Sequence, residues 1–426
     1  MRTEASAALQ GRRILVAASG SIAAVKLPQL VSGLVKAGAE VRCVVTDSAA
    51  RLVSPLALAT LSRHRCYQES DQWDPACHRP LHIELAEWAE LLILAPLSAS
   101  TLSRWSQGAA DTLLASVLLA AEVPVLAAAA MNTAMWRHPA VQRNWGLVCS
   151  YPGVVPLLPT SGLLACDRVG DGRMADPALI QLAAEALFSR SGTSAVADQD
   201  LLGRRLLVTA GPTREAIDGA RVLTNNSSGR MGVLLAQAAR LRGAVVDLLH
   251  GPLALPEAWL EGLQCCAVDS AAELEAALSL RQPTADAVVM AAAVADMRRD
   301  VVTSTKLAKT RLPELLSQGW VEVPDLLSGL KRRRPDGQLV LGFAALSGDD
   351  EALIDAGERK RIAKGCHLMF VNPIDRQGQG FGDQANGGWL LGDGLRQQLP
   401  VMPKLALAQR ILDGLLELQA AASKAS

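Results

Sequence analysis

The sequence predicts an α/β protein built from two doubly wound, Rossmann-like domains with mainly parallel sheets. A short apolar run, opened by arginines and closed by a glycine turn, occurs twice, at residues 12–20 and 204–211. Each run is typical of the first buried strand of such a domain. After each run, short apolar segments alternate with helical patterns, and strands separated by helices favour a parallel sheet.

The first half follows this pattern element by element. An amphipathic helix is predicted from apolar residues spaced i, i+3, i+4 and i+7, which are Leu27, Leu30, Val31 and Leu34. Further strands are predicted at 41–46, 91–95 and 123–127. The most membrane-like stretch, 112–131, has Glu122 and Pro124 in its middle. We therefore interpret it as a buried helix followed by a buried strand, and not as a membrane span.

The second half repeats the alternation after a linker. Residues 189–200 are small and polar and lack apolar periodicity. We therefore predict domains at 1–189 and 203–426, joined by a linker at 190–202. One helix face is formed by Met231, Leu234, Ala238 and Leu241. Strands are predicted at 244–249, 287–291, 339–343 and 368–371, a terminal hairpin from 388–392, and a closing helix at 405–418.

The composition excludes several classes of protein. Hydrophobic residues make up 50% and charged residues 20% of the 426 residues, which excludes a disordered or fibrous chain. Lys plus Arg number 42 and Asp plus Glu number 42. Bulk charge thus predicts neither a nucleic-acid nor a membrane partner, although a local basic patch stays possible. The eight cysteines include no Cys-x-x-Cys pair and residues 1–13 lack the apolar core of a signal peptide, so we expect reduced thiols in a cytoplasmic protein.

A turn of small residues, Ser19-Gly20-Ser21-Ile22, joins the first strand to the first helix. Free N–H groups at a helix start favour an anion such as a phosphate. A tight strand-to-helix turn, which every domain of this kind needs, is the alternative. The G-x-G-x-x-G fingerprint of dinucleotide binding is absent from this turn.

His82 and Glu84 would point to the same side if their segment were extended. A structural role for this lone histidine is the alternative. His78 and His82 are four residues apart and Cys77 is adjacent, which raises a metal site, but a fourth ligand is not evident.

Two further segments of the first half carry candidate functional residues. Asn132 follows a strand end, where ligands gather in open α/β sheets, with a helix N-cap as the alternative role. The segment 161–174 combines three glycines with Cys166 in a polar loop. Such a loop indicates mobility and function more than packing, and a free cysteine on it is a candidate acid or nucleophile.

Taken together, these motifs resemble the homo-oligomeric flavin-containing cysteine decarboxylases, and most closely phosphopantothenoylcysteine decarboxylase, over residues 10–188. The resemblance implies that FMN oxidises the cysteine side chain of the substrate to a thioaldehyde, so that decarboxylation yields an enethiolate. It implies that His82 assists as a base, that Asn132 binds the substrate carboxylate and that Cys166 is the acid when the enethiol is reduced. The residues it implies as FMN contacts are Gly20, Ser21, Ile22, Thr46, Ser48, Ser98, Ala99, Ser100 and Thr101.

Small residues also open a helix in the second half, at 225–232. Free N–H groups there suit a phosphate-like ligand, with a simple N-cap as the alternative. No G-x-x-x-x-G-K-[ST] P-loop is present in the sequence. Asp296 follows a buried strand, and Lys306 and Lys309 lie in a stretch with little periodicity, which we predict to be a flexible basic loop able to close over a ligand.

Lys360 and Lys364 are four residues apart on a predicted helix. Like charges at this spacing cost roughly 0.2–0.5 kcal/mol. A bound polyphosphate would offset the repulsion, although solvated lysines tolerate it too. The basic run 331–334 is predicted to be a solvated loop.

The second half resembles phosphopantothenate–cysteine ligase of the CTP-using bacterial kind over residues 203–415. The resemblance implies that Asn225 positions an acyl-cytidylate and that Lys306 stabilises charge as the carboxylate attacks the α-phosphate, with Mg²⁺ neutralising the triphosphate. The CTP contacts it implies are Ala292, Asp296, Lys306, Pro324, Asp325, Leu326, Leu327, Phe343, Lys360 and Lys364. The sequence departs from the family's usual residues at Leu346, His367 and Pro373, which leaves the finer nucleotide contacts open.

The two resemblances together imply a bifunctional enzyme of coenzyme A synthesis. Its expected substrates are 4′-phosphopantothenate, cysteine and CTP, and its expected product is 4′-phosphopantetheine. The decarboxylase family implies trimers and the ligase family dimers, so we expect a homo-oligomer. A decarboxylase of peptide C-terminal cysteines and a flavin-binding regulatory subunit are the alternatives. The ligase half argues against the first, and the presence of His82 and Cys166 against the second.

Overall fold

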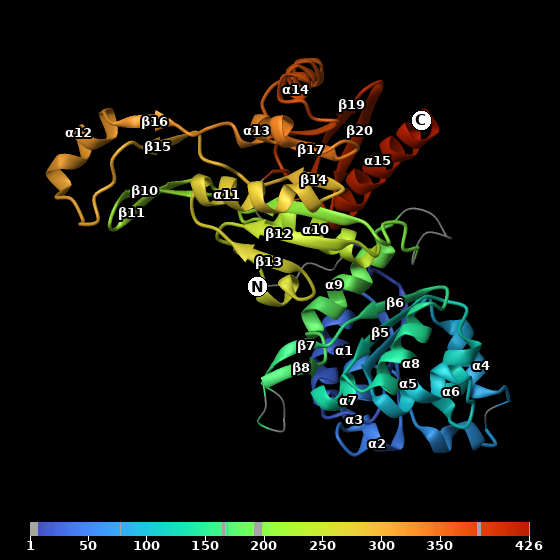
Figure 1. Ribbon diagram of the computed structural model, residues 1–426. Helices are drawn as coiled ribbons and strands as arrows, with labels where there is room; N and C mark the ends of the chain where they lie inside the picture. The colour runs from blue at the N-terminus through green and yellow to red at the C-terminus, as the bar shows by residue number, and fades with distance from the viewer. Residues whose placement is uncertain are drawn as a thin grey trace. The chain divides into compact units, whose positions relative to one another are not determined.

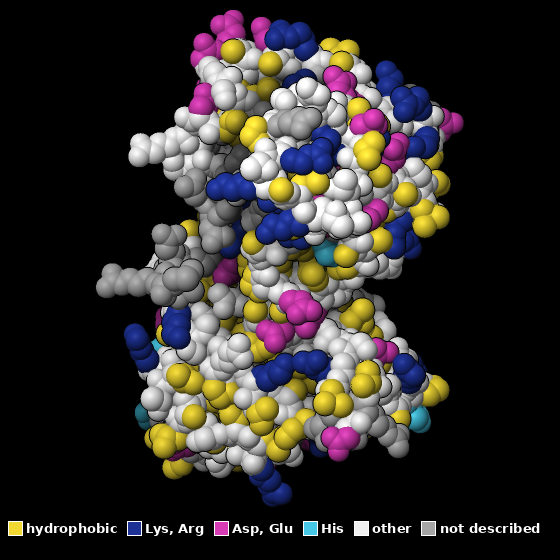
Figure 2. Space-filling view, turned by 90° about the vertical axis from the view of Figure 1, so that its left-hand side faces the viewer, with side chains coloured by type: hydrophobic (Ala, Val, Ile, Leu, Met, Phe, Trp, Pro, Cys, Tyr) yellow, Lys and Arg dark blue, Asp and Glu magenta, His cyan; other side chains and the backbone are white. Residues whose placement is uncertain are grey.

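The computed structural model describes residues 7–76, 78–163, 167, 169–190, 198–380 and 385–425. The chain divides into two compact units (Figure 1). The first unit takes the described residues up to Asp198 together with Glu257–Gly262, and the second takes Gln199–Pro256 and the chain from Leu263 onward. Apolar, basic and acidic side chains all appear on the visible face in the space-filling view (Figure 2).

The first unit is built on a six-stranded sheet in the order β3-β2-β1-β4-β5-β6. Every neighbouring pair in this sheet is parallel, as the sequence predicts. The strand order reverses between β1 and β4, and ligands of doubly wound sheets bind outside the carboxyl ends of strands at such a switch point. The strands are β1 Arg13–Ala18, β2 Glu40–Val45, β3 Cys66–Tyr67, β4 Leu91–Leu97, β5 Val125–Ala129 and β6 Val154–Leu157.

Helices cover both faces of this sheet. One face carries α1, α3 and α9, and the other carries α4, α5, α6 and α8, whose apolar residues form a common core with Leu15, Leu92 and Leu94. A two-stranded hairpin, β7 with β8, follows β6 in the chain. The elements outside the sheet are η1 Ile22–Lys26, α1 Leu27–Lys36, α2 Asp47–Ala50, α3 Pro55–Ser62, η2 Glu69–Trp73, α4 Leu81–Trp88, α5 Ala99–Ser106, α6 Leu113–Ala120, α7 Thr133–Trp136, α8 Pro139–Cys149, β7 Thr160–Leu163, β8 Val169–Arg173, α9 Pro177–Phe188 and η3 Glu257–Leu260.

The apolar stretch 112–131 is a buried helix, α6, followed by a buried strand, β5, as predicted. Among the described residues, no helix is both long enough and apolar enough to span a bilayer.

The second unit is built on an eight-stranded sheet in the order β13-β12-β9-β14-β17-β18-β19-β20. It is parallel from β13 to β18, and the last two strands add the predicted antiparallel hairpin. The strands are β9 Arg205–Ala210, β12 Val245–His250, β13 Gln264–Ala267, β14 Ala287–Met290, β17 Leu339–Leu346, β18 Leu368–Pro373, β19 Asn386–Gly392 and β20 Leu395–Met402.

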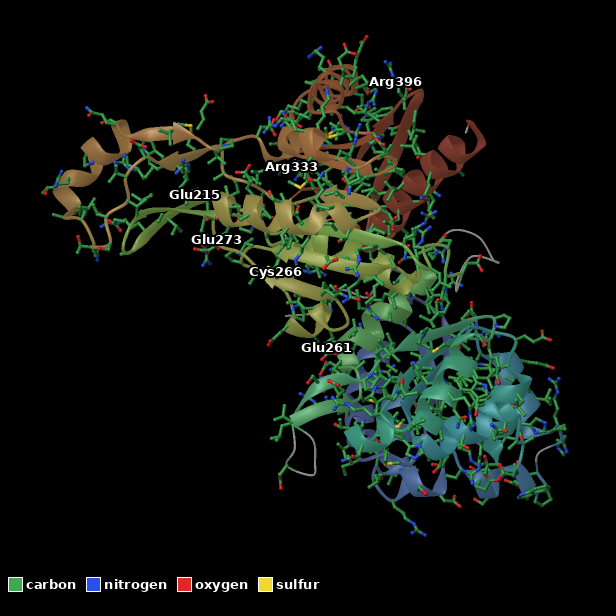
Figure 3. All side chains as sticks on the ribbon, viewed as in Figure 1. Glu215, Glu261, Cys266, Glu273, Arg333 and Arg396 are labelled. Carbon is green, nitrogen blue, oxygen red and sulfur yellow. The ribbon has the colours of Figure 1, made fainter. Side chains whose placement is uncertain are left out.

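Helices again lie on both faces. Helices α10 and α15 contact each other on one face, and apolar residues of α11, α13 and α14 pack against Leu207, Val288 and Met369 on the other. These helices are α10 Arg230–Leu241, α11 Ala271–Arg281, η4 Gln282–Thr284, α13 Leu326–Arg333, α14 Asp350–Lys364 and α15 Lys404–Ala425. The prediction of a solvated loop at 331–334 is wrong, because Lys331, Arg332 and Arg333 form the last turn of α13, where the helix dipole favours cations (Arg333, Figure 3).

An arm of two small antiparallel sheets projects from the second unit (Figure 1, left). One sheet pairs β10 with β11, and the other pairs β15 with β16. None of these strands is predicted from the sequence. The elements of the arm are β10 Arg214–Asp218, β11 Arg221–Thr224, β15 Met297–Arg299, η5 Lys309–Arg311, α12 Leu312–Ser317 and β16 Trp320–Glu322.

Candidate functional site

In the first unit, the predicted flavin contacts follow the carboxyl ends of three strands. Gly20, Ser21 and Ile22 follow β1, Thr46 and Ser48 follow β2, and residues 98–101 follow β4. Since these strands are parallel, the structure brings all the contacts to one edge of the sheet, at the switch point between β1 and β4.

Ser19 ties two of these turns together across the switch point. Its buried hydroxyl donates to the carbonyl of Pro96 at 2.8 Å and accepts from the N–H of Ser98 at 2.8 Å. A Cβ at Gly20 would lie 2.5 Å from the Cβ of Ser48, so the turn after β1 closes directly onto α2 only because residue 20 is glycine. The edge therefore offers small side chains, hydroxyls and helix starts, which suit a phosphate-bearing cofactor such as FMN.

Several predicted contacts also cap helices. Thr46 accepts from the N–H of Ala49 at 3.3 Å, and Ser98 accepts from the N–H of Thr101 at 3.4 Å. Asn132 caps α7, accepting from the N–H of Ala134 at 2.8 Å. The capping role that the sequence left open for Asn132 is therefore present, at the carboxyl end of β5.

The extended conformation considered for the His82 segment is not adopted, because the segment is helical. His82 lies in the first turn of α4, because Pro80 precedes the helix and Leu81 and Leu85, one turn apart, are both buried in the core. Since α4 leads into the amino end of β4, its first turn is directed toward the carboxyl edge of the sheet. His82 is half-buried there, and Glu84 pairs with Arg42 at 3.3 Å.

Among the described residues, no group of three or more His, Cys, Asp or Glu side chains could hold a metal ion. Cys77, the third member of the metal site weighed from the sequence, lies outside the described residues.

Cys166 also lies outside the described residues, but strands on both sides of it are placed. The hairpin strand β8 packs on the Asn132 turn, because the N–H of Met131 donates to the carbonyl of Gly172 at 3.1 Å. A Cβ at Gly172 would lie 2.2 Å from the carbonyl oxygen of Met131, which explains the glycine. Arg137 and Asp171 join α7 to β8 through an ion pair of 3.1 Å.

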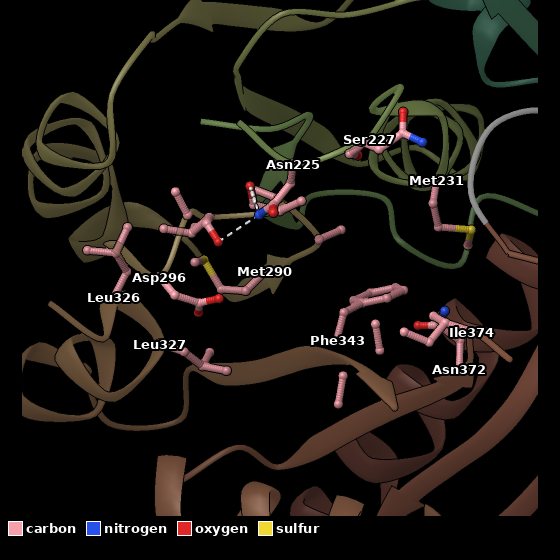
Figure 4. Close-up of a pocket in the computed structure, with 18 of the residues that line it drawn as sticks. Asn225, Ser227, Met231, Met290, Asp296, Leu326, Leu327, Phe343, Asn372 and Ile374 are labelled. Carbon is pink, nitrogen blue, oxygen red and sulfur yellow. Dashed lines mark hydrogen bonds between the residues drawn. The ribbon is translucent and has the colours of Figure 1, made fainter. Parts of the chain in front are cut away.

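The second unit contains a cavity of about 920 Å³ at the carboxyl end of β14 and β17 (Figure 4). Ten of the eleven residues predicted in this half line it, namely Asn225, Ala292, Asp296, Pro324, Asp325, Leu326, Leu327, Phe343, Lys360 and Lys364. The eleventh, Lys306, is exposed in the arm and is not among the lining residues.

The wall of this cavity is held by side-chain hydrogen bonds to backbone. The amide nitrogen of Asn225 donates to the carbonyls of Ala293 and Val294 at 3.1 and 3.0 Å (Figure 4). Thr209, fully buried, accepts from two N–H groups of the same segment. Thr213, also buried, accepts from the N–H of Ala295 at 3.0 Å. The segment before Asp296 is therefore fixed by Asn225 and by two buried threonines to which the sequence assigns no functional role.

The serines before α10 accept hydrogen bonds from backbone N–H groups of the same turn, while the N-cap of the helix is Gly229 and has no side-chain cap. Ser227 accepts from the N–H of Gly229 at 3.3 Å, and Ser228 accepts from the N–H of Arg230 at 3.4 Å. Gly229 has φ +74°, and a Cβ there would lie 2.2 Å from the side chain of Leu253. This turn therefore requires glycine for both conformation and space.

Asp325 and Lys364 pair inside the cavity at 3.5 Å. Burial acts to raise the pKa of Asp325, but hydrogen bonds from Ser328 and the ammonium of Lys364 hold that pKa below its usual range. The carboxylate therefore offsets part of the repulsion between Lys360 and Lys364, which both lie on α14 as predicted.

The three departures from the ligase family do not line the cavity. His367 accepts from the N–H of Val340 at 3.0 Å, and burial together with Arg334 and Arg361 lowers its pKa. Leu346 accepts from the N–H of Ile374 at 3.0 Å. Pro373 stands between two lining residues, Asn372 and Ile374, so it is the nearest of the three to the cavity.

Sequence reasoning missed several polar residues of the cavity wall, which are Arg230, Glu322, Asn372, Asn386 and Lys404. Lys404 is 8% exposed and donates to the carbonyl of Gly380 at 2.9 Å. The only sequence signal for it is its position at the start of the closing helix, just after a proline.

Two family models match the chain. The model described as Flavoprotein matches residues 2–188, and that described as DNA/pantothenate metabolism flavoprotein C-terminal domain matches residues 201–418.

Curated relatives match along nearly the whole chain. The coenzyme A biosynthesis bifunctional protein CoaBC of Bacillus subtilis (strain 168) is 38% identical over 407 residues, covering 95% of this chain and 96% of the relative. That of Escherichia coli (strain K12) is 37% identical over 409 residues, covering 95% and 97%.

Solved structures resemble the two units separately. One is a PPC decarboxylase mutant complexed with pantothenoylaminoethenethiol, with 37% identity, a TM-score of 0.38 and coverage of 40% of this chain and 94% of that chain. Another is the C-terminal domain of a CoaBC protein, with 31% identity, a TM-score of 0.43 and coverage of 52% and 100%. On the family models and the full-length relatives, the chain belongs to the family of bifunctional coenzyme A biosynthesis enzymes named CoaBC, which combine a decarboxylase and a ligase.

Proposed function

We propose that the two activities divide between the two halves of the chain. Residues 1–189 form an FMN-dependent phosphopantothenoylcysteine decarboxylase, 190–202 a linker, and 203–426 a CTP-dependent phosphopantothenate–cysteine ligase. The ligase joins 4′-phosphopantothenate to cysteine, and the decarboxylase converts that product to 4′-phosphopantetheine. The observation that carries the proposal is that ten residues predicted to serve the ligase line one and the same cavity.

In the decarboxylase, FMN would lie at the carboxyl edge of the six-stranded sheet, held by the turns after β1, β2 and β4. Bound FMN would accept the electrons of substrate oxidation and would return them when the decarboxylated enethiol is reduced to the product. His82, directed toward the same edge, serves as the base. Asn132 binds the substrate carboxylate, and Cys166 supplies the proton in the final reduction.

In the ligase, the carboxylate of phosphopantothenate attacks the α-phosphate of CTP and pyrophosphate leaves. The amine of cysteine then attacks the acyl-cytidylate and displaces CMP. Asn225 positions the intermediate, and Lys306 stabilises the charge that develops in the first step. The lining lysines, Lys360 and Lys364, bind the triphosphate.

Mg²⁺ enters this reaction with the nucleotide. Magnesium is commonly bound by one or two carboxylates plus substrate phosphates, and not by a complete protein cage. The carboxylates among the residues that line the cavity are Asp296, Glu322 and Asp325. We propose a homo-oligomer, with trimeric contacts in the decarboxylase and dimeric contacts in the ligase.

The test is to incubate the full chain with phosphopantothenate, cysteine and either CTP or ATP, and to identify the products by mass. We expect CTP to yield CMP, pyrophosphate and phosphopantetheine, and the purified protein to be yellow. A protein that stays colourless after addition of FMN and forms no product with either nucleotide would contradict both halves of the proposal.

A further inference from the structure

The turn of the β10–β11 hairpin is bonded to the loop that carries Lys306. Asp218 ends β10, and its side chain is fully buried. One carboxylate oxygen accepts from the N–H of Ala220 at 2.8 Å, within the hairpin turn. The other accepts from the N–H of Leu307 at 3.2 Å and from the guanidinium of Arg221 at 2.8 Å. The carboxylate thus joins the hairpin to the residue next to Lys306.

Further contacts hold the same loop against the hairpin. Thr303 pairs with Asp218 in an isolated parallel bridge, and the guanidinium of Arg221 donates to the carbonyl of Leu307 at 3.5 Å. A Cβ at Gly219 would lie 2.0 Å from the carbonyl oxygen of Ser304, so only glycine allows the turn to approach this closely. The segment 303–307 is therefore held on both sides of Lys306, while Lys306 itself is exposed.

The other end of the hairpin is fixed to the cavity wall. Thr224 ends β11 and donates from its hydroxyl to the carbonyl of Thr213 at 2.8 Å. Asn225 follows at once and bonds two carbonyls of the cavity wall. At about 3.3 Å per residue, β11 places its two ends about 10–13 Å apart. The β10–β11 hairpin is thus a short connection, bonded at one end to the cavity wall and at the other end to the Lys306 loop.

We propose that Asp218 is a positioning residue for Lys306, and that it sets where the Lys306 loop stands relative to Asn225. The inference rests on the proposed role of Lys306 in the ligase. Asp218 is not among the residues that line the cavity. Its loss is therefore expected to slow the step that Lys306 serves without weakening the binding of CTP to the cavity.

The first test measures the tether itself, without reference to activity. Trypsin cleaves after lysine, so the rate of cleavage after Lys306 reports whether the loop is held. In the full chain, Asp218→Ala should speed this cleavage about tenfold, because hydrogen bonds to a charged group are lost. Asp218→Asn, which keeps one acceptor oxygen, should have an intermediate rate. Equal rates in the wild type and Asp218→Ala would overturn the tether.

Asp247→Asn is the matched control. Asp247 is a buried aspartate of the same unit, on β12, bonded by Arg205 at 2.7 Å and by Arg281 at 2.6 Å. Among the described residues its carboxylate bonds Arg205 and Arg281 and no residue of the loop, so its loss should destabilise the unit and leave cleavage after Lys306 unchanged. Cleavage accelerated equally in both variants would mean that general destabilisation, not the tether, exposes the loop.

The second test asks whether Asp218 acts through Lys306. Pyrophosphate release at saturating CTP should be about tenfold slower in Asp218→Ala, with the KM for CTP unchanged, as expected for the loss of charged hydrogen bonds that hold the loop. Combining it with Lys306→Gln should give a rate no lower than Lys306→Gln alone. A further slowing in the double variant, or a normal rate in Asp218→Ala, would overturn the positioning role. If the wild type releases no pyrophosphate with CTP, the ligase proposal fails, while the cleavage test still decides the tether.

Discussion

Replacing Thr209 by valine should loosen the cavity wall while preserving the shape of the core. The Thr209 hydroxyl is fully buried on β9 and accepts from the N–H of Ala291 at 3.1 Å and of Ala292 at 3.0 Å. Valine has nearly the same volume and no acceptor, so both N–H groups lose this partner. A buried donor left unsatisfied costs about 1–3 kcal/mol. Because Ala291 and Ala292 are half-buried and water can reach them, we expect a total of about 2 kcal/mol.

Thermal unfolding and hydrogen exchange measure this loss. For a unit of this size, 2 kcal/mol corresponds to a fall in Tm of about 4–8 °C. Amide exchange should rise in the peptide 287–296, and the KM for CTP should rise because Ala292 and Asp296 belong to the wall. Thr284→Val is the control, since its exposed hydroxyl bonds only the carbonyl of Arg281, within one turn. An unchanged Tm and an unchanged exchange rate in Thr209→Val would show that the hydroxyl does not hold the wall.

Five further substitutions separate stability from ligand binding. Arg242→Met should cost about 3 kcal/mol in thermal unfolding and leave the flavin bound, because Arg242 is 2% exposed and pairs with two aspartates at 2.7 and 2.9 Å. The folded-state pKa of Asp325 is lowered, so the stability that its carboxylate contributes is complete at neutral pH and is lost as the pH falls below about 4. The free energy of unfolding in urea should therefore change less between about pH 5 and 3 in Asp325→Asn than in the wild type. Lys360→Met should raise the KM for CTP about tenfold. Lys364→Met should raise this KM too, and it should also lower Tm because it breaks the ion pair of 3.5 Å with Asp325. Ser98→Asp keeps a good helix cap but adds a negative charge at the proposed phosphate edge, so it should lose FMN absorbance, and a yellow Ser98→Asp protein would place the phosphate elsewhere.

The central strands of the two sheets and their flanking helices could be predicted because these strands are buried on both faces. Strand β4, for example, is buried along its whole length, and such runs are apolar without alternation. The edge strand β13, with three of its four residues exposed, was not predicted. The arm could not be predicted in this way. Its strands are three to five residues long and β10 and β15 carry charged residues, so no apolar period marks them. They are stabilised by contacts distant in sequence, such as the bond between Asp218 and Leu307.

The candidate sites were predictable where a residue follows a strand directly. Asp296 and Phe343 share one cavity because the parallel strands β14 and β17 bring their carboxyl ends to one edge, whereas Asn225 reaches the same cavity from the end of the antiparallel strand β11. Asn386 and Lys404 were missed because their position depends on the antiparallel return of β19 and β20, whose register local sequence does not determine. The helix that carries His82 was not predicted, because an eight-residue helix shows too few turns to establish a helical period.

For several residues the sequence left open whether they cap a helix or bind a ligand. These two roles are compatible. In a doubly wound sheet each strand end leads into a helix start, so capping residues and ligand-binding residues occupy the same positions. Thr46, Ser98, Asn132 and Asp325 all cap helices through side-chain oxygens. Alanine at any of them would remove a cap worth about 1 kcal/mol as well as any ligand contact. Only replacements that keep the cap and change charge or size can therefore report on the ligand alone.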